Sequence, residues 1–300
     1  MTFRSLFVDA FVPPISSQPE YWFETRRPFC NLVFLLPLLL AYEVGVYVIG
    51  SSSGDSARNG ADAWMRLGLQ RLGVDLLWLL PALLVGALLS WQWASRQPWR
   101  MSWDTLGGML AESLLFAFVL ILIGQLTDFC FRQAAPPSLQ LSMAGCAHSF
   151  SIGGHSPPYL LQVGETAWNA GFLVKLIAFM GAGIYEEFLF RLCLIPVTYA
   201  AFRALFLPHR WSVGGTIVLT SLVFSLAHYL GPAADGQSLS LLTEAVARVQ
   251  SSRSLCFSFV FRTLAGMFFA SLFFLRGFGI TVGTHAVYDV FVGIVLVSEV

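Results

Sequence analysis

Charged residues are scarce in this chain, and lysine is almost absent. Only 11% of the 300 residues are charged, against about 25% in ordinary soluble proteins, and the single lysine is Lys175. No basic tract occurs, so the composition gives no support for a nucleic-acid-binding protein. Because 56% of the residues are hydrophobic, too few polar side chains remain to cover a soluble core. The composition therefore indicates a polytopic membrane protein.

Several covalent and targeting signals are also missing. The five cysteines show no CxxC or zinc-ligand spacing, which argues against a structural metal site. We expect Cys130 and Cys146 to pack as small apolar groups, since a disulfide between them requires an oxidising compartment. No N-x-S/T sequon is present, and the first 28 residues lack the compact apolar run and cleavage site of a signal peptide.

Long apolar runs, in contrast, are frequent. A helix needs about 20 apolar residues to cross a membrane. Seven such segments are found, at 29–50, 74–94, 105–131, 168–200, 212–230, 255–276 and 278–298. The sequence therefore predicts an all-α fold, a polytopic transmembrane helical bundle of about seven spans, with six to eight as the limits. No internal repeat and no second, soluble domain is evident.

Three long loops connect these segments. Residues 51–73 combine arginines with tryptophan, methionine and leucine, which predicts an amphipathic stretch at the membrane surface. Residues 132–167 are rich in serine, glycine and proline and contain two histidines. Residues 231–254 contain an apolar and charged run at 241–248, where we expect a short surface helix.

The fourth segment carries three ionisable residues within six positions: Glu186, Glu187 and Arg191. Even on mild scales each such residue costs about 2.5–3.5 kcal/mol at the bilayer centre. Glu187 and Arg191 have i, i+4 spacing and can pair on one helix face. Glu186 lies about 100° further round the helix, so it is free to point elsewhere. The alternative is that all three lie at a helix end and extend to water.

Two further motifs place histidines in the later segments. Phe224 and His228 share a helix face near the end of the fifth segment, and His285 and Asp289 share one in the last. A carboxylate beside an imidazole fixes its tautomer and raises its basicity. The alternatives are an interfacial histidine for the first motif and a simple His–Asp pair between two helices for the second.

Other acidic residues of the first three segments lack a partner nearby in the sequence. Interhelical hydrogen bonding or an interfacial position is expected for each of them, namely Glu43, Asp75, Glu112 and Asp128.

Together the three motifs supply the groups that activate water. A carboxylate withdrawn from bulk solvent is a competent base, and histidines stabilise a developing oxyanion. The same residues, Glu186, His228, His285 and Asp289, are also the ligand set of a possible zinc site. One geometric difficulty is that the two histidines lie at opposite ends of helices expected to run parallel. At a rise of 1.5 Å per residue their depths differ on the order of 10 Å.

The ordered set Glu-Glu-x-x-x-Arg, Phe-x-x-x-His and His-x-x-x-Asp resembles the CPBP family. These intramembrane glutamic proteases are typified by the type II CAAX prenyl endopeptidase and bacterial Abi-type proteins. The resemblance covers about residues 168–298 and implies a water-activating role for Glu186. We divide the chain accordingly into an N-terminal membrane region, 1–167, with three spans and their loops, and a CPBP-like protease core, 168–300.

The last motif departs from the family pattern. Asp289 occupies a position that is commonly asparagine, and an ionised carboxylate cannot donate a hydrogen bond to an oxyanion. Asp289 therefore has to orient His285, be protonated or bind a metal. Leu192 also follows Arg191 where the family often has a small residue, which changes a helix contact and leaves the chemistry untouched.

The sequence thus predicts a membrane-embedded endopeptidase that cleaves a membrane-associated protein or peptide. The catalytic residues are Glu186, His228, His285 and Asp289, and the supporting residues are Glu187, Arg191 and Phe224. No cofactor is expected, and zinc stays open. The alternatives are a proton-coupled membrane transporter and a non-catalytic membrane scaffold of the same fold. The arginine-rich, lysine-poor composition favours a bacterial cytoplasmic (inner) membrane, where prenylated substrates are not expected.

Overall fold

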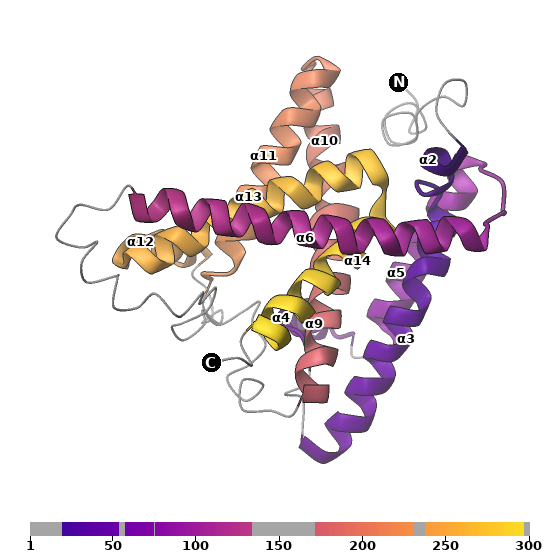
Figure 1. Ribbon diagram of the computed structural model, residues 1–300, viewed down its shortest axis with the longest axis horizontal. Helices are drawn as coiled ribbons and strands as arrows, with labels where there is room; N and C mark the ends of the chain where they lie inside the picture. The colour runs from indigo at the N-terminus through magenta and orange to yellow at the C-terminus, as the bar shows by residue number, and fades with distance from the viewer. Residues whose placement is uncertain (1–19, 54–57, 75, 134–171, 231–237, 297–300) are drawn as a thin grey trace.

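Every regular element of the described chain is a helix (Figure 1). The computed structural model describes residues 20–53, 58–74, 76–133, 172–230 and 238–296. The elements within these ranges are α2 (Glu20–Glu24), α3 (Pro28–Ser53), α4 (Gly60–Arg71), α5 (Leu79–Ser95), α6 (Trp103–Gln133), α9 (Phe172–Glu187), the π-helix η2 (Phe188–Leu194), α10 (Ile195–Ala204), α11 (His209–Ala227), α12 (Ser238–Ser251), α13 (Arg253–Arg276), α14 (Phe278–Val290) and the π-helix η3 (Phe291–Leu296). The predicted all-α fold is confirmed.

The helices agree with a polytopic membrane protein. Within the described residues four helices are long and apolar enough to cross a membrane: Pro28–Ile49, Trp103–Gln133, His209–Ala227 and Arg253–Arg276. Leu79–Ser95 is a shorter apolar helix. The two remaining predicted segments are each interrupted by a π-helix, at η2 and η3. Asp75, Cys146 and the histidines of the loop at 134–167 lie outside the described residues.

Helix α14 lies at the centre of the bundle. It packs against α6, α9, α3 and α13, and every residue from Phe278 to Ala286 is buried. The long helix α6 runs across α14 and α13 (Figure 1). Helix α11 packs along α13. The last helix is therefore enclosed both by its C-terminal neighbours and by two helices from the first half of the chain.

Small residues allow the central helices to approach closely, as is usual in membrane bundles. A Cβ atom on Gly183 of α9 would lie 2.7 Å from the backbone nitrogen of Ala286 in α14. A Cβ on Gly266 of α13 would lie 3.0 Å from Cβ of Ser221 in α11. Both contacts lie within one or two turns of the predicted catalytic residues.

The acidic residues of the early spans have partners, which the sequence did not reveal. Glu112 of α6 forms two bonds to Arg276 of α13, 2.6 and 2.7 Å long. Asp128 pairs with Arg132 at 2.8 Å, one turn along the same helix. The expected interhelical hydrogen bonding is confirmed for Glu112 and for Glu43, which bonds Tyr185 of α9. For Asp128 the expectation of no nearby partner was wrong, because Arg132 lies one helical turn away.

A buried polar cluster holds helix α4 against α3. Asp62 is fully buried and accepts hydrogen bonds from Tyr42 of α3 (2.8 Å), Arg58 (2.8 Å) and Arg66 (2.6 Å). The Arg66 guanidinium also lies 3.9 Å from Glu43 of α3. Two of the three arginines of this loop, Arg58 and Arg66, therefore neutralise a buried carboxylate.

The same cluster reaches helix α9. The Tyr185 hydroxyl donates a hydrogen bond to Glu43, and the rings of Tyr185 and Tyr42 lie 5.4 Å apart. Both tyrosines are fully buried. Because Tyr185 immediately precedes Glu186, the cluster fixes the rotation of α9 at the point where the acidic pair begins.

Candidate functional site

The acidic pair lies at the end of an α-helix that continues as a π-helix. Helix α9 ends at Glu187, and η2 begins at Phe188. Both glutamates are buried, with 3% and 0% of their surface exposed. Short π-helical segments are rare and frequently occur at functional sites. This one changes the helix winding directly after the two carboxylates.

Glu187 contacts one basic side chain on η2, Arg191, and one on α14, His285. One carboxylate oxygen lies 3.0 Å from Nε of Arg191 in η2, and the other lies 2.7 Å from Nδ1 of His285 in α14. All three side chains are almost completely buried. The pair with Arg191 was expected from the spacing, and the bond to His285 was not. Glu187 therefore holds the imidazole as well as the guanidinium.

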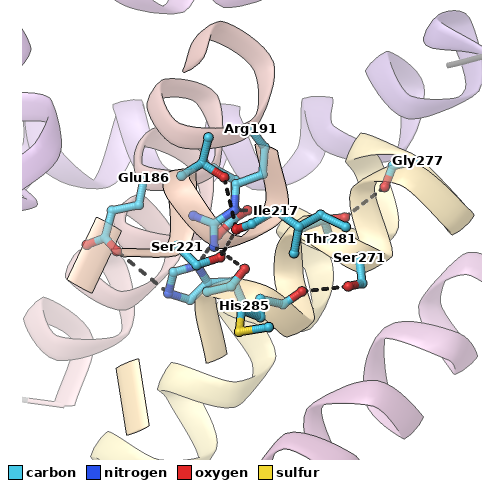
Figure 2. A network of polar contacts seen from close by, with 12 residues as sticks. Glu186, Arg191, Ile217, Ser221, Ser271, Gly277, Thr281 and His285 are labelled. Carbon is cyan, nitrogen blue, oxygen red and sulfur yellow. Dashed lines mark hydrogen bonds and ion pairs between the residues drawn. The ribbon is translucent and has the colours of Figure 1, made fainter. Parts of the chain in front are cut away.

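Glu186 faces two histidines from two other helices. Its Oε2 lies 3.8 Å from Nε2 of His285 and 3.9 Å from Nε2 of His228. Figure 2 shows Glu186 and His285 pointing toward one another beside Arg191. The expected difference in depth between the histidines is absent, because both ring nitrogens reach the same carboxylate oxygen. Separations above 3.5 Å between polar groups are typical of a bridging water.

His228 is oriented by its own helix end. It occupies the C-terminal cap of α11, and its Nδ1 lies 2.9 Å from the carbonyl oxygen of Phe224. A carbonyl only accepts hydrogen bonds, so Nδ1 carries the proton. In the neutral ring, Nε2 is then the unprotonated nitrogen that faces Glu186.

Asp289 lies on the other nitrogen of His285. Its Oδ2 is 3.3 Å from Nε2, one helical turn beyond His285, and its side chain is 21% exposed. Of the carboxylates around His285, Asp289 is therefore the one nearest to solvent. Glu187 makes the shorter contact with His285, on Nδ1, and Asp289, for which orienting His285 was one of three alternatives, lies on Nε2.

Aromatic rings enclose the charged groups. The Arg191 guanidinium lies 4.5 Å from the ring centre of Phe224 and 5.4 Å from that of Phe269. Phe269 stacks on His285 with centroids 4.5 Å apart and planes at 16°. Phe224 meets His228 edge to face at 4.9 Å. The rings keep bulk water away from these charges, which strengthens their interactions.

The structure thus brings all seven predicted site residues together from α9, η2, α11 and α14. A residue that the motifs missed is Arg262, in the middle of α13. The sequence did contain a sign of this residue, because an arginine inside an apolar span marks a candidate functional residue.

The spacing of the donor atoms bears on the zinc site that the sequence left open. Within the described residues no group of three or more His, Cys, Asp and Glu side chains is arranged to hold a metal ion. Donors around a tetrahedral zinc lie about 3.4 Å apart. The Glu186 oxygen lies 3.9 and 3.8 Å from the histidine nitrogens, and Glu187 bonds His285 through Nδ1, which leaves Nε2 facing Glu186.

Comparison with known proteins gives one match. The model of the Rce1-like family, type II CAAX prenyl endopeptidase Rce1-like, matches residues 167–291. No curated protein and no solved structure matches the chain. The matched segment contains all three motifs and all seven site residues. Residues 167–291 of this membrane protein are thus similar to the Rce1-like type II CAAX prenyl endopeptidase family, a family of proteases, and this match supports the resemblance carried by the ordered motifs.

Proposed function

We propose that this protein is an intramembrane endopeptidase in which Glu186 activates a water molecule for attack on a peptide bond. The observation that carries the proposal is the position of Glu186. Its Oε2 lies 3.8 and 3.9 Å from two histidine nitrogens of different helices, in a pocket of buried side chains. A water at about 2.8 Å from each of these atoms has hydrogen-bonding partners on three sides.

The proton positions follow from the hydrogen bonds. His228 donates through Nδ1 to Phe224, so its neutral Nε2 accepts a hydrogen bond from the water. His285 donates through Nδ1 to Glu187, and its Nε2 donates only when the ring is an imidazolium. Glu187 and Asp289, next to its two nitrogens, supply the negative charge that this cation needs.

The charges of the proposed site nearly balance. Three carboxylates (Glu186, Glu187 and Asp289) face two cations (Arg191 and the His285 imidazolium), which leaves one negative charge. That charge passes to the substrate oxyanion when Glu186 takes a proton from water and the oxygen adds to the carbonyl carbon. The net charge of the site therefore stays the same through the first step, and the His285 imidazolium faces the charge in its new position.

In the proposed reaction Glu186 removes a proton from water while the oxygen attacks the carbonyl carbon. The carbonyl oxygen becomes an oxyanion, to which the Nε2–H of His285 donates. Glu186 then returns the proton to the nitrogen of the scissile bond, the C–N bond breaks, and an acid and an amine result. No metal takes part in these steps.

The substrate class follows from the location of the site. The proposed catalytic groups lie among the packed helices of a membrane protein, so we propose a membrane-associated protein or peptide as substrate and a peptide bond that reaches the buried pocket. The composition supports a bacterial cytoplasmic membrane as the compartment.

A comparison of membrane-protein termini tests the proposal. Cells that carry the wild-type protein are compared with cells that carry Glu186→Gln at equal abundance. We expect at least one new N-terminus that appears in the wild type only. Identical termini in both strains would contradict the proposal, because the variant keeps the shape of the site and removes the base.

A further inference from the structure

We propose that Arg262 of α13 is a carboxylate-binding residue of the substrate site, an inference that rests on the proposed endopeptidase function. Several arginines lie in the helices packed around the site, and at least two of them have a carboxylate partner. Arg191 pairs with Glu187 and Arg276 pairs with Glu112. Arg262, in contrast, has no carboxylate within 4 Å in the part of the chain that the structure describes.

The contacts of Arg262 use only one of its nitrogens. Nη1 donates to Ser258 Oγ at 2.6 Å and lies 3.4 Å from the Tyr229 hydroxyl. The other two nitrogens, Nη2 and Nε, have no hydrogen-bond partner among the described residues, and neither is fully buried. They form one edge of the guanidinium, which is the edge that binds a carboxylate through two parallel bonds.

The surroundings place the Arg262 guanidinium next to Tyr229, the residue that follows His228. Tyr229 follows His228 directly, is fully buried, and donates to the Leu255 carbonyl at 3.0 Å. The guanidinium also lies 5.8 Å from the Tyr229 ring centre. Further along α13, Phe269 stacks on His285. The helix that carries Arg262 therefore lines the site at both histidines.

The chemistry of this position favours an anion. A half-buried guanidinium in an apolar helix is costly unless an opposite charge compensates it. The hydroxyls of Ser258 and Tyr229 orient the group without neutralising it. A substrate carboxylate supplies the missing charge, and it comes either from a free C-terminus or from an acidic side chain near the scissile bond.

A binding measurement separates these sources. The full-length protein carries Glu186→Gln to prevent cleavage and is placed in zwitterionic lipid nanodiscs. The probes are a dansylated, palmitoylated tetrapeptide of alanine and leucine with a free C-terminus, the same peptide as its amide, and the amide with one glutamate. We expect the free acid or the glutamate peptide, whichever presents the carboxylate correctly, to bind at least about tenfold more tightly than the neutral amide.

Substitution of Arg262 provides the decisive comparison. In Arg262→Gln the preference for the carboxylate should fall to within about twofold, whereas Arg262→Lys should keep part of it. The control is Arg132→Gln, which removes a partly exposed arginine that already has a carboxylate partner and should keep the full preference. Thermal melting of each variant confirms that it is folded.

Two results would overturn the inference. One is equal binding of all three probes by the protein that keeps Arg262. The other is a preference for the carboxylate probe that persists in Arg262→Gln. The outcome is independent of the proposed function. A preference that depends on Arg262 in a protein that cleaves nothing would remove the endopeptidase proposal alone. Cleavage that depends on Glu186, with no role for Arg262 in binding, would remove this inference alone.

Discussion

Glu187 does more at this site than its sequence spacing suggests. Its two oxygens hold Arg191 and His285 at 3.0 and 2.7 Å, so one carboxylate fixes both a guanidinium and an imidazole. Glu186 is left without a direct hydrogen bond among the described side chains. The two adjacent glutamates therefore have different roles: one is structural and electrostatic, and the other is available to bind water.

The first prediction compares the two carboxylates next to His285. We expect Glu187→Gln to lower the cleavage rate at least about 100-fold and to destabilise the protein by about 3–5 kcal/mol, because Arg191 loses its buried counter-charge. Asp289→Asn should lower the rate less than about tenfold, since Glu187 still holds the imidazole through Nδ1. Cleavage rates and denaturant unfolding in micelles measure both effects. A larger loss in Asp289→Asn would show that Asp289, and not Glu187, holds the imidazole.

At the level of the helix, the contact between α9 and α14 sets the bond from Glu187 to His285. The close approach depends on Gly183, whose substitution by alanine would bring a Cβ to 2.7 Å from the Ala286 nitrogen. Backbone atoms cannot move aside as a flexible side chain can. The two helices must then separate, and the catalytic groups move with them.

Gly183→Ala should therefore destabilise the protein by about 1–3 kcal/mol and lower the cleavage rate about 100-fold through misplacement of Glu186 and Glu187. Gly214→Ala on α11 is the matched control, because no atom lies within 4 Å of its Cβ position. Its stability should rise by up to about 1 kcal/mol, with full activity. Melting curves and cleavage rates test the pair, and equal behaviour of the two variants would refute the role of the close contact.

The hydrogen bond from Tyr185 to Glu43 leads to a prediction about how helix α9 is held. Tyr185→Phe removes the hydroxyl that bonds Glu43 and leaves a buried carboxylate with fewer partners, which should cost about 1–3 kcal/mol. In a double-mutant cycle with Glu43→Gln, the two changes should couple by more than about 0.5 kcal/mol. Strictly additive free energies of unfolding would show that this bond does not hold α9.

The sequence predicted the helices better than it predicted the contacts between them. The apolar runs predicted the helices well, because hydropathy alone decides which segments enter a membrane. The spacing of Glu187 and Arg191 also predicted their ion pair. The bond from Glu187 to His285 and the pair of Glu112 with Arg276 join residues far apart in the chain, and no local pattern records them. The π-helix at Phe188–Leu194 likewise has no sequence signature that we used.

On the scale of the whole molecule, the matched family region depends on the helices before it. Helix α14 packs against α6 and α3, and the Gly279 nitrogen donates to Asn31 of α3 at 2.6 Å. The Glu112–Arg276 pair joins α6 to α13. The matched region is therefore packed against helices that lie outside residues 167–291.

A fragment of residues 167–300 should accordingly fail to form an active protein in membranes, and co-expression of residues 1–166 should restore part of the activity. The physical reason is that the buried faces of α13 and α14 lose their partners. Protease resistance and cleavage activity of the membrane fraction report the result. Full activity of the fragment alone would contradict a structural role for the N-terminal helices.

The central claim is that Glu186 is the base that activates water, and one rate comparison tests it most directly. The purified full-length protein and Glu186→Gln are assayed on a membrane-tethered substrate found from the termini, with Glu244→Gln on α12 as control, since that glutamate is exposed and outside the site. We predict a loss of at least about 10³-fold in Glu186→Gln, with unchanged melting, and no loss in the control. Cleavage by Glu186→Gln at the wild-type rate would contradict the account.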